Sequence, residues 1–530
     1  MSFLVPLIAV GTAAFAVEIP FFFLGTPSGH DVEFHLNSWL EVLMQWKHGI
    51  FFPRWASLAN FGYGEPRFIF YPPVSWLLGA SLAAVFPWTL VSAIFIWLVL
   101  TLSGMSMFML ARRWFNRRTA IFASALYAVN PYHLVIVYWR SAFAELLASC
   151  LLPMLFLLIL RIEEGNRRVT IPLAMVLSAA WLTNAPAAVM IHYSLALLLL
   201  ILAWKQRTAQ ILTVGGGAIV LGACLAAFYL IPAVYEQRWV DIGQAISAGS
   251  RPQDNFLFIH TGDGDHDHFN HVISWVALLE MGVILGTGVA ARIRQTMQKE
   301  TWTLLAAWAF ACSVLLFPLT ALLWRIFPKL EFMQFPWRWL LCLSMIFCLF
   351  VTAGAHRWWM RSAICAVAIL TIALTWHFIQ QPWWDAAADL RELQDNVTDH
   401  IGYEGTDEYT PTGADPSALN KDAPNVGVIG AGPAKISISQ WDAESKRFTA
   451  ELLGPTQLQL RLFQYPAWKA VVNGKVVQAT KGNVGQLLVP VESGMNDVQI
   501  KFIRTWDQTL GDWISLITAF CMGGWFVLTR

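Results

Sequence analysis

Two carboxylates, Asp31 and Glu33, stand two residues apart in the run Gly29-His30-Asp31-Val32-Glu33-Phe34-His35. From a loop, both side chains can reach one site, where a carboxylate can take a proton from an attacking hydroxyl or amine or can ligate a metal. Asp31 also precedes a stretch with helical spacing, so capping of a helix start is the alternative. The spacing alone leaves both readings open.

A second candidate segment, residues 62–73, combines glycines, aromatic residues and an acid-base pair. Glu65 and Arg67 lie in it, and Tyr71 directly precedes Pro72-Pro73. Glycines let a backbone approach a ligand closely, and a guanidinium can contact an anion. An ordinary turn with aromatic residues at a membrane interface is the alternative.

Two more arginines, Arg140 and Arg338, stand at the ends of apolar stretches, and Glu145 follows Arg140 by five residues. Together with Arg67 they could hold a lipid phosphate through bidentate hydrogen bonds. Arginine also extends to a membrane interface with no ligand at all. Because the three arginines are expected at one membrane level, binding of a ligand is the favoured interpretation.

Other polar residues carry weaker signals. Asn184 interrupts an apolar stretch, where it can bind a ligand hydroxyl or simply end a helix, and helix termination is favoured. The segment 260–271 offers His260, Asp265 and His268 as ligands for a divalent metal, but without a defined zinc spacing. A solvated polar loop is therefore the favoured reading of that segment. All seven cysteines lie in apolar runs, so no disulfide framework is implied.

The composition determines the class of protein that must position these residues. Hydrophobic residues make up 57% of the 530 residues and charged residues 13%, against about 25% charged in soluble proteins. A soluble globular protein is excluded. The formal charge of +1 provides no overall attraction for nucleic acid.

Apolar stretches of about 20 residues predict about twelve membrane crossings. They lie near residues 3–24, 88–111, 118–138, 141–160, 170–184, 186–204, 209–231, 272–290, 301–319, 336–354, 361–380 and 512–529. If each stretch crosses once, every Lys and Arg cluster between them falls on one side, which is then the cytoplasmic side. The first stretch is expected to be a retained membrane helix, because no Lys or Arg precedes it as in a signal peptide.

The same topology places residues 25–87, 232–271 and 381–511 outside. Within the first outer loop, 34–48 has the spacing of an interfacial helix, and 72–86 is expected to dip into or lie along the outer leaflet. After residue 381 the chain turns polar, and short alternating runs over 446–504 predict strands. Asn473-Gly474 predicts a hairpin turn.

The sequence therefore predicts a polytopic α-helical membrane protein with about 12 crossings, outer-leaflet helices and a C-terminal extracytoplasmic β-rich domain. The expected units are a transmembrane domain at 1–380, which contains the first outer loop at 25–87, then the β-rich domain at 381–511 and a final transmembrane helix at 512–530.

The order of these features resembles the GT-C glycosyltransferases, which include oligosaccharyltransferases, protein O-mannosyltransferases and bacterial lipid A aminoarabinose transferases. The resemblance maps the catalytic acidic motif of that superfamily onto Asp31, with Glu33 as its companion. Tyr71-Pro72-Pro73-Val74 with Trp76 is similar to a Pro-Pro-Leu stretch of the aminoarabinose-transferase-like branch. That branch has a Lys on the donor phosphate where this chain has Tyr71, and Arg67 is the substitute candidate.

Scattered strings resemble a second, closer group, the bacterial membrane proteins labelled 6-pyruvoyl-tetrahydropterin-synthase-related. They are Gly62-Tyr63-Gly64, Phe70-Tyr71-Pro72-Pro73, Pro131-Tyr132-His133, Arg140 with Glu145, Gln334-Phe335-Pro336-Trp337-Arg338 and Gly405-Thr406-Asp407-Glu408-Tyr409. The label suggests a soluble pterin enzyme, and nothing in so apolar a chain supports that chemistry.

The expected function is an integral-membrane glycosyltransferase of the bacterial inner membrane. It would move a sugar from a polyprenyl-phosphate donor to an extracytoplasmic glycan, lipid or protein acceptor, among membrane lipids and without nucleic acid. Asp31 and Glu33 are the catalytic candidates, and a divalent metal is the one candidate cofactor. The substrate-binding candidates are His35, Glu65, Arg67, Tyr71, Arg140, Glu145, Asn184 and Arg338.

Two alternatives come from other classes of protein. A lipid or sugar transporter or flippase would line a path with buried charges, but the candidates here gather at the outer ends of the crossings. A non-catalytic envelope protein that binds glycans would leave the carboxylates of the first loop without a task.

Overall fold

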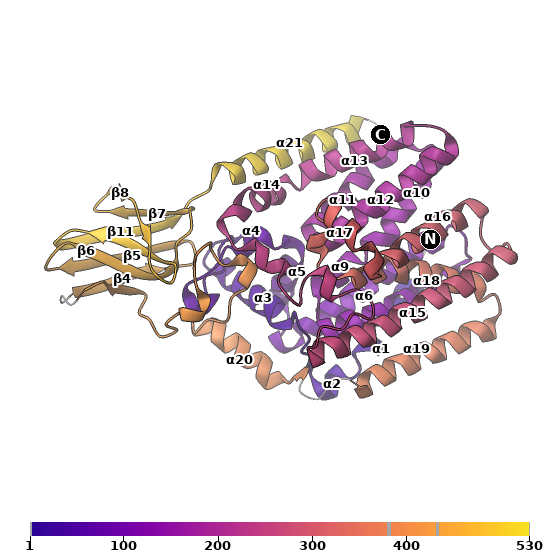
Figure 1. Ribbon diagram of the computed structural model, residues 1–530, viewed down its shortest axis with the longest axis horizontal. Coiled ribbons are helices and arrows are strands. Elements are labelled where there is room, and N and C mark those ends of the chain that lie inside the picture. Colours follow the sequence, from indigo (N-terminus) through magenta and orange to yellow (C-terminus); the bar gives the residue numbers. More distant parts are fainter. Residues whose placement is uncertain (1–2, 379–382, 431–433, 529–530) are drawn as a thin grey trace.

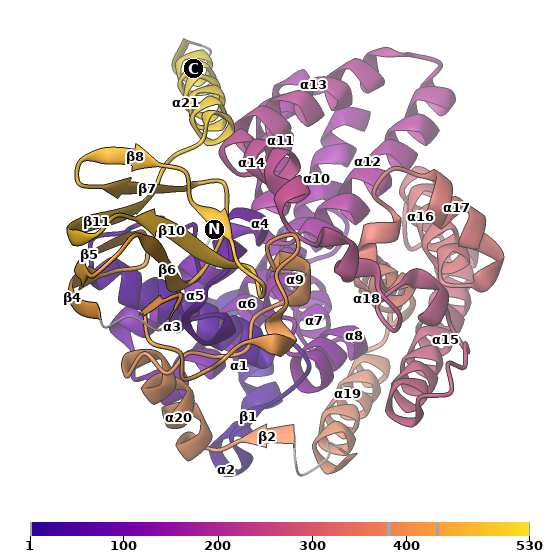
Figure 2. The same ribbon diagram turned by 60° about the vertical axis from the view of Figure 1, so that its left-hand side comes forward.

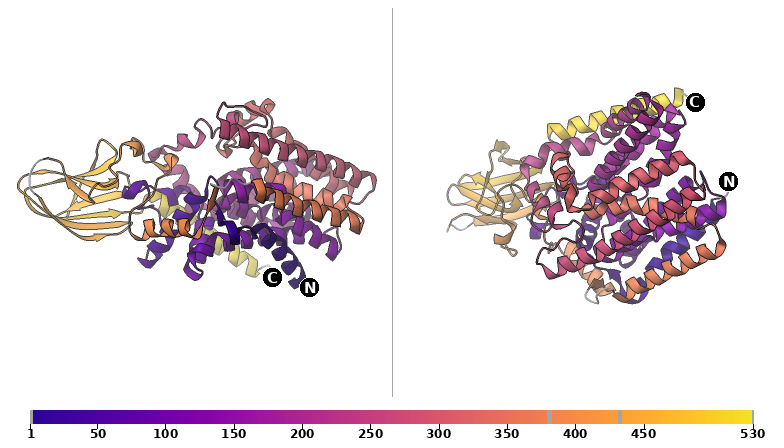
Figure 3. Two further views of the ribbon diagram at one scale, coloured as in Figure 1. Left: turned by 90° about the horizontal axis from the view of Figure 1, so that it is seen from below. Right: turned by 45° about the vertical axis from the view of Figure 1, so that its right-hand side comes forward.

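The computed structural model describes residues 3–378, 383–430 and 434–528. A bundle of long helices forms one part of the molecule, and a β-sandwich projects from one end of that bundle (Figure 1). Two further views show the same two parts joined end to end (Figure 3). The bundle therefore has one end beside the sandwich and one end remote from it.

Long apolar helices make up most of the bundle. Eight helical segments of 18–30 residues in the described ranges are long and apolar enough to cross a membrane. At 1.5 Å per residue they measure about 27–45 Å, enough for a hydrocarbon core of about 30 Å. They are α1 (Leu4–Glu18) with α2 (Phe21–Leu24), α6 (Trp88–Ala111), α7 (Arg117–Ala128) with α8 (Pro131–Val135) and a π-helical turn (Ile136–Arg140), α9 (Phe143–Ala148) with α10 (Leu151–Glu163), α12 (Ala185–Gln206), α15 (Gly264–Ile293), a 3-10 turn (Pro336–Trp339) with α18 (Leu340–Gly354), and α19 (Trp358–Phe378).

Two further apolar segments are bent pairs of helices. The break between α13 (Gln210–Leu225) and α14 (Ala227–Glu236) bends by 76°, and that between α16 (Lys299–Leu315) and α17 (Ala321–Ile326) bends by 89°. With each pair counted as one span, the described residues give ten spans where about twelve were predicted.

The other two predicted crossings correspond to α11 (Thr170–Thr183) and α21 (Trp506–Leu528), which lie outside that set. α11 has 14 residues, about 21 Å of helix, and is too short to cross alone. A hydropathy window registers apolar length but not helix ends, and this explains why α11 was counted as a crossing. α21 has 23 residues, about 34 Å of helix, which is long enough to cross.

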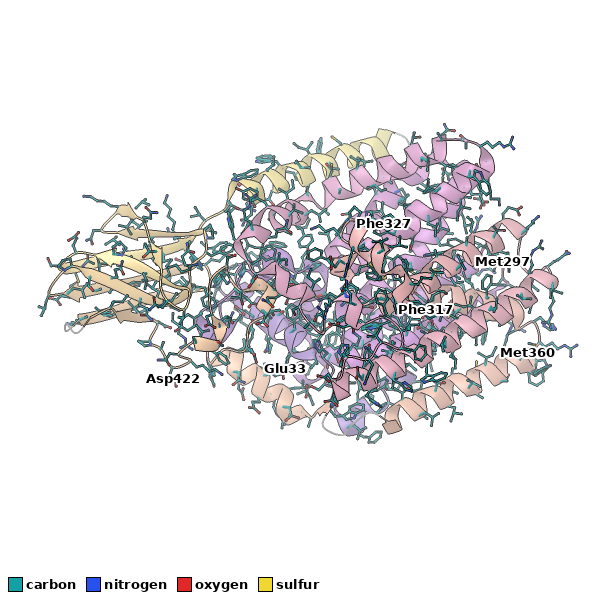
Figure 4. The ribbon with its side chains drawn as sticks, in the orientation of Figure 1. Glu33, Met297, Phe317, Phe327, Met360 and Asp422 are labelled. Atoms are coloured by element: carbon teal, nitrogen blue, oxygen red, sulfur yellow. The ribbon has the colours of Figure 1, made fainter. Side chains whose placement is uncertain are left out.

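The basic loops lie together at the end of the bundle remote from the sandwich. Arg113, after α6, forms an ion pair with Glu164, after α10. Arg294, after α15, donates to the Gly354 carbonyl at the end of α18. Met297, in the loop between α15 and α16, marks this end of the molecule (Figure 4). The bundle therefore has one basic end, as the charge pattern predicted.

The first loop is folded against the other end of the bundle. After β1 (Thr26–Pro27), which pairs with β2 (Trp384–Asp385), it forms α3 (Val32–Lys47), α4 (Arg67–Phe70) and α5 (Pro73–Val85). α5 has 13 residues, about 20 Å, so it does not reach across a hydrocarbon core.

α3 occupies the segment that the sequence identified as an interfacial helix. It packs against α5 and α20 (Ala387–Thr398), and its polar residues Asn37, Glu41 and Gln45 are buried. The helix itself is confirmed, but protein covers its polar side where water was expected. The cover comes from segments distant in sequence, which a local amphipathic pattern cannot reveal.

The β-rich part contains two antiparallel sheets, seen obliquely in Figure 2. One has the order β3-β6-β10-β9 and the other β4-β5-β11-β7-β8. Asn473 and Gly474 join β7 to β8 with φ values of 49° and 78°, the backbone of a tight hairpin turn, so the predicted hairpin is confirmed. The strands are β3 (Val426–Val428), β4 (Ala434–Trp441), β5 (Ser445–Leu452), β6 (Thr456–Phe463), β7 (Trp468–Val472), β8 (Lys475–Val477), β9 (Thr480–Lys481), β10 (Gln486–Val491) and β11 (Gly494–Phe502).

The sandwich is anchored on the first loop. Trp55, Tyr63 and Phe70 of that loop belong to the same buried cluster as the core of the sandwich. α20 packs against α3 and α6 before the first strand of the sandwich begins. The domain boundary expected at 380/381 lies outside the described residues.

Candidate functional site

Asp31 lies where the first loop enters α3. It occupies the N-cap position, yet its side chain accepts no capping hydrogen bond from the helix. Oδ1 instead lies 2.8 Å from His30 Nδ1, and Oδ2 lies 3.6 Å from the guanidinium of Arg140. The side chain is 31% exposed, so the carboxylate faces both the arginine and the surroundings.

The charges beside Asp31 keep it ionised. Burial disfavours the carboxylate, but the hydrogen bond from His30 and the positive charge of Arg140 outweigh this effect and hold the pKa of Asp31 well below its usual range. The same hydrogen bond raises the pKa of His30. Asp31 is therefore negatively charged throughout the physiological pH range.

Glu145 holds Arg140 and Arg338 side by side. Nη1 of Arg140 donates to Glu145 Oε2 at 2.5 Å, and Nε of Arg338 lies 3.2 Å from the same oxygen. Tyr132 donates to Glu145 Oε1 at 2.5 Å. All four side chains are buried, where an ion pair persists only if its partners compensate one another. The carboxylate thus orients both guanidinium groups toward one place.

Two aromatic rings line the arginines. Phe335 and Trp337 stack with their centroids 4.7 Å apart. The guanidinium of Arg140 lies 4.7 Å from the Trp337 ring, and that of Arg338 lies 4.7 Å from the Phe335 ring. Cation–π contacts of this kind restrict the orientation of a guanidinium and keep water away from it.

A close backbone contact brings Asp31 to Arg140. Ser141 follows the π-helical turn with a φ of 50°, and its Oγ accepts a hydrogen bond from Gly29 N at 3.0 Å. Asp31 N donates to the Arg140 carbonyl at 2.9 Å. A Cβ at Gly29 would lie 2.6 Å from the carbonyl carbon of Arg140, so this approach requires glycine.

His35 and Tyr71 border the same region. Their ring centroids lie 5.8 Å apart, and the His35 ring lies 5.2 Å from that of Phe143. Burial lowers the pKa of His35 to about 4 and raises the pKa of Tyr71. The imidazole is therefore neutral and the phenol protonated, so both can form hydrogen bonds without adding charge beside Asp31.

Glu65 and Arg67 belong to a separate network. Arg67 donates to Glu65 at 2.7 Å, to Ser38 Oγ at 3.1 Å and to Thr406 Oγ1 at 3.1 Å. Its side chain is 2% exposed. Each of its three nitrogens is engaged by a protein group, so Arg67 ties the first loop to the segment at Thr406. Arg67 therefore does not share Glu145 with Arg140 and Arg338.

Glu33 and Asn184 belong neither to the cluster around Glu145 nor to the network around Arg67. Glu33 is exposed in the first turn of α3 and lies toward the sandwich end of the bundle (Figure 4). Asn184 Oδ1 accepts a hydrogen bond from Ala187 N at 2.9 Å, which caps α12 and agrees with helix termination.

The three candidate metal ligands of the segment 260–271 do not converge on one point. His260 is paired with Asp267, Asp265 is exposed, and His268 lies 5.8 Å from the ring of Trp139. Within the described ranges, no group of three or more His, Cys, Asp or Glu side chains is placed to hold a metal ion. The predicted polar loop is wrong for most of this segment, because residues 264–271 form the first two turns of α15 and Asp263 caps that helix through Asp265 N and His266 N.

Sequence reasoning assigned no role to His30 and Tyr132, which bind the two central carboxylates. His30 directly precedes Asp31, and an adjacent His-Asp pair was the available signal. Tyr132 precedes Arg140 by eight residues, but the π-helical turn between them alters the side-chain register. That turn could not be inferred from the apolar pattern.

Comparison with known proteins gives two positive findings, while no curated protein matches the chain. The first finding concerns solved structures of the oligosaccharyltransferase of Archaeoglobus fulgidus. The apo form is similar with a TM-score of 0.40 and 14% identity, over 74% of this chain and 56% of that chain. The form tethered to an acceptor peptide gives 0.40 and 13%, over 76% of this chain and 55% of that chain. This chain therefore spans little more than half the length of that oligosaccharyltransferase.

The second finding is a match to a protein family. Residues 68–381 match the model described as the 6-pyruvoyl-tetrahydropterin synthase related domain, a membrane protein family. The match covers more than half of the chain and includes Tyr71, Arg140, Glu145 and Arg338. The chain belongs to this family, and it is a multi-pass membrane protein.

Proposed function

We propose that this protein is a membrane glycosyltransferase that moves a sugar from a polyprenyl-phosphate donor to an acceptor on the extracytoplasmic side. The observation that carries the proposal is the ionised, partly exposed carboxylate of Asp31 beside two buried arginines that share Glu145. A carboxylate can accept the proton of the acceptor, and a pair of guanidinium groups can stabilise a departing phosphate.

The transfer step assigns one role to each charge. The acceptor hydroxyl or amine attacks the anomeric carbon, the bond from that carbon to the phosphate oxygen breaks, and the lipid phosphate leaves with the electron pair. The acceptor proton passes to Asp31. Arg140 and Arg338 stabilise the negative charge that accumulates on the leaving phosphate.

The low pKa of Asp31 determines when the proton moves. A carboxylate held by His30 and Arg140 is a weak base, so it cannot fully deprotonate a hydroxyl before the attack. Sugar transfer passes through an oxocarbenium-like transition state, in which the attacking oxygen becomes acidic as its bond to carbon forms. A weak but permanently ionised base therefore suffices if proton transfer follows bond formation.

The positions of arginines at the two ends of each span support a site on the extracytoplasmic side. Arg140 and Arg117 stand at opposite ends of one membrane-spanning segment, and Arg338 and Arg357 stand at opposite ends of another. Arg117 and Arg357 belong to the basic loops, which face the cytoplasm in most membrane proteins. Arg140, Arg338 and Asp31 then lie near the outer leaflet, at the level where a lipid phosphate resides.

Replacement of Asp31 by Asn tests the reaction. Asn retains the size and a hydrogen-bonding oxygen but loses the charge, so we expect transfer to fall by about 10²- to 10⁴-fold. The measurement is sugar transfer by the purified full-length protein in nanodiscs, with lipid-linked sugars extracted from the host membrane as donors. Donor binding should be retained, since Arg140 and Arg338 are unchanged.

Glu33→Gln is the matched control, because it makes the same charge change two residues away on an exposed side chain. We expect it to transfer sugar at close to the rate of the unmodified protein. Near-normal transfer by Asp31→Asn would contradict the assignment of Asp31 as the base. Equal losses of transfer in the two variants would mean that the two carboxylates act together, as in a shared metal site.

A further inference from the structure

A cavity lies between the C-terminal end of α3 and the β-sandwich. Its volume is about 390 Å³, within the range of about 300–1,000 Å³ that is typical of ligand pockets. α3, the loop after it, the turn between β4 and β5, and β6 all contribute to its walls. None of Asp31, Arg140, Glu145 and Arg338 lines it, so it is separate from the site described above.

The end of the sandwich gives this cavity an aromatic wall. Trp441, the last residue of β4, lines the cavity and is partly exposed. Lys446 lies behind it, with Nζ 5.6 Å from the Trp441 ring centroid and 2.9 Å from the Ala443 carbonyl. This lysine fixes the turn that carries the indole. A partly exposed, positioned indole is a surface on which the apolar face of a flat or sugar-like ligand can stack.

Polar side chains of the lining are accessible from the cavity. His48 and His400 are exposed, and Asn425 and Asp442 are partly exposed. Imidazole, amide and carboxylate groups can each form hydrogen bonds with the hydroxyls of a polyhydroxylated ligand.

Positive charge predominates at the cavity. Arg461 donates through Nε to the Phe61 carbonyl at 2.6 Å and through Nη1 to the Ala423 carbonyl at 3.4 Å, which holds its guanidinium in the wall. Burial lowers the pKa of Lys446 to about 7, so this group contributes a partial charge near neutrality. Asp442 is the one carboxylate in the lining. An acidic group on the ligand would therefore be favoured near Arg461.

We infer that this cavity binds a saccharide, with one ring stacked on Trp441, its hydroxyls toward His48, His400 and Asn425, and a preference for uronic acid sugars. Met44, the first residue of α3 that lines it, follows Asp31 by 13 residues, about 20 Å of helix. The inference stands independently of sugar transfer, since binding here involves none of the residues assigned to that reaction.

Binding can be measured on the full-length protein in nanodiscs by saturation-transfer NMR. The probes are tetragalacturonate, maltotetraose and chitotetraose at millimolar concentration. We expect saturation transfer to the saccharides, strongest for tetragalacturonate. Trp441→Ala should weaken binding at least tenfold, whereas Trp441→Phe, which retains an aromatic ring, should weaken it less. No transfer to any of the three probes would overturn the inference.

Phe51→Ala is the matched control. Phe51 is 76% exposed, belongs to the loop after α3 that lines the cavity at Ile50, and does not itself line the cavity. Its loss should leave binding unchanged, and an equal effect of Phe51→Ala and Trp441→Ala would overturn the inference. Asp31→Asn should also bind the probes normally, so failure of the transfer reaction and failure of this site give different results.

Discussion

At the scale of single residues, the site depends on how its charges are partitioned. Asp31 and Glu145 are both carboxylates near Arg140, but only Glu145 is fully buried, between the two arginines. Asp31 is partly exposed and has His30 as its second partner. Glu145 is therefore suited to orient the arginines, and Asp31 to meet a molecule that arrives from outside.

His30→Ala tests the electrostatic part of this arrangement. The substitution removes the hydrogen bond that helps to lower the pKa of Asp31, so that pKa should rise while Arg140 still restrains it. If transfer requires ionised Asp31, the acid limb of the pH profile of kcat/KM should move to higher pH. His271→Ala replaces another exposed histidine, whose ring accepts a hydrogen bond from Trp275 Nε1, and should leave the profile unchanged.

The pair His30–Asp31 also makes stability depend on pH in two opposite ways. The contribution of Asp31, whose pKa is lowered by folding, is present above its ordinary pKa and is lost as the pH falls toward the lowered value. The contribution of His30, whose pKa is raised, is present below its ordinary pKa and is lost as the pH rises through the raised value.

If the acid limb of the kcat/KM profile is unchanged in His30→Ala, a group other than Asp31 controls that limb.

At the scale of elements, a loop and a broken helix create the site. The helix α7–α8 ends in a π-helical turn, and Ser141 then reverses the chain in a left-handed conformation. The carbonyl and hydroxyl exposed by this break bind the backbone of Gly29 and Asp31. π-Helical turns occur often at functional sites, and here the turn sets the distance between the carboxylate and Arg140.

Gly29→Ala tests this contact. The added Cβ would lie within 2.7 Å of three backbone atoms of residues 139–141, so the loop must move away from Arg140. Overpacking of this kind costs about 1–3 kcal/mol, and we expect a lower thermal unfolding temperature together with a loss of transfer. Gly216→Ala in α13, where a Cβ meets nothing within 4 Å, should be tolerated. Normal transfer by Gly29→Ala would show that the position of Asp31 is not critical.

The same elements show how far the sequence could predict the structure. The α3 helix, the short α5 and the Asn473-Gly474 hairpin follow from local signals, and the structure has all three. The bends after α13 and α16 and the burial of the polar side of α3 depend on packing between distant segments, and these were missed. The site divides in the same way, because Arg140 and Arg338 were singled out by type and position, whereas their shared partner Glu145 Oε2 follows only from the fold.

At the scale of the whole molecule, the two ends of the bundle differ in charge and in the structure that they carry. Met297 and Met360 lie near the basic loops at one end, and Asp422 lies beside the sandwich at the other (Figure 4). The Asp31 site and the cavity at Trp441 are both on the sandwich side, linked by α3. A saccharide chain held at the cavity would thus share one face of the membrane with the proposed donor phosphate.

The orientation can be tested with two matched lysines. Lys475 lies in the β7–β8 hairpin and Lys299 begins α16 at the basic end, and both are exposed. Lys475→Cys and Lys299→Cys would each be introduced after the exposed native cysteines, Cys365 and Cys521, are replaced by Ser. Since basic loops are retained in the cytoplasm, a membrane-impermeant thiol reagent should label position 475 in intact spheroplasts, and position 299 only after permeabilisation. Labelling of position 299 alone in intact cells would show the opposite orientation. The Asp31 site would then face the cytoplasm, away from any acceptor outside it.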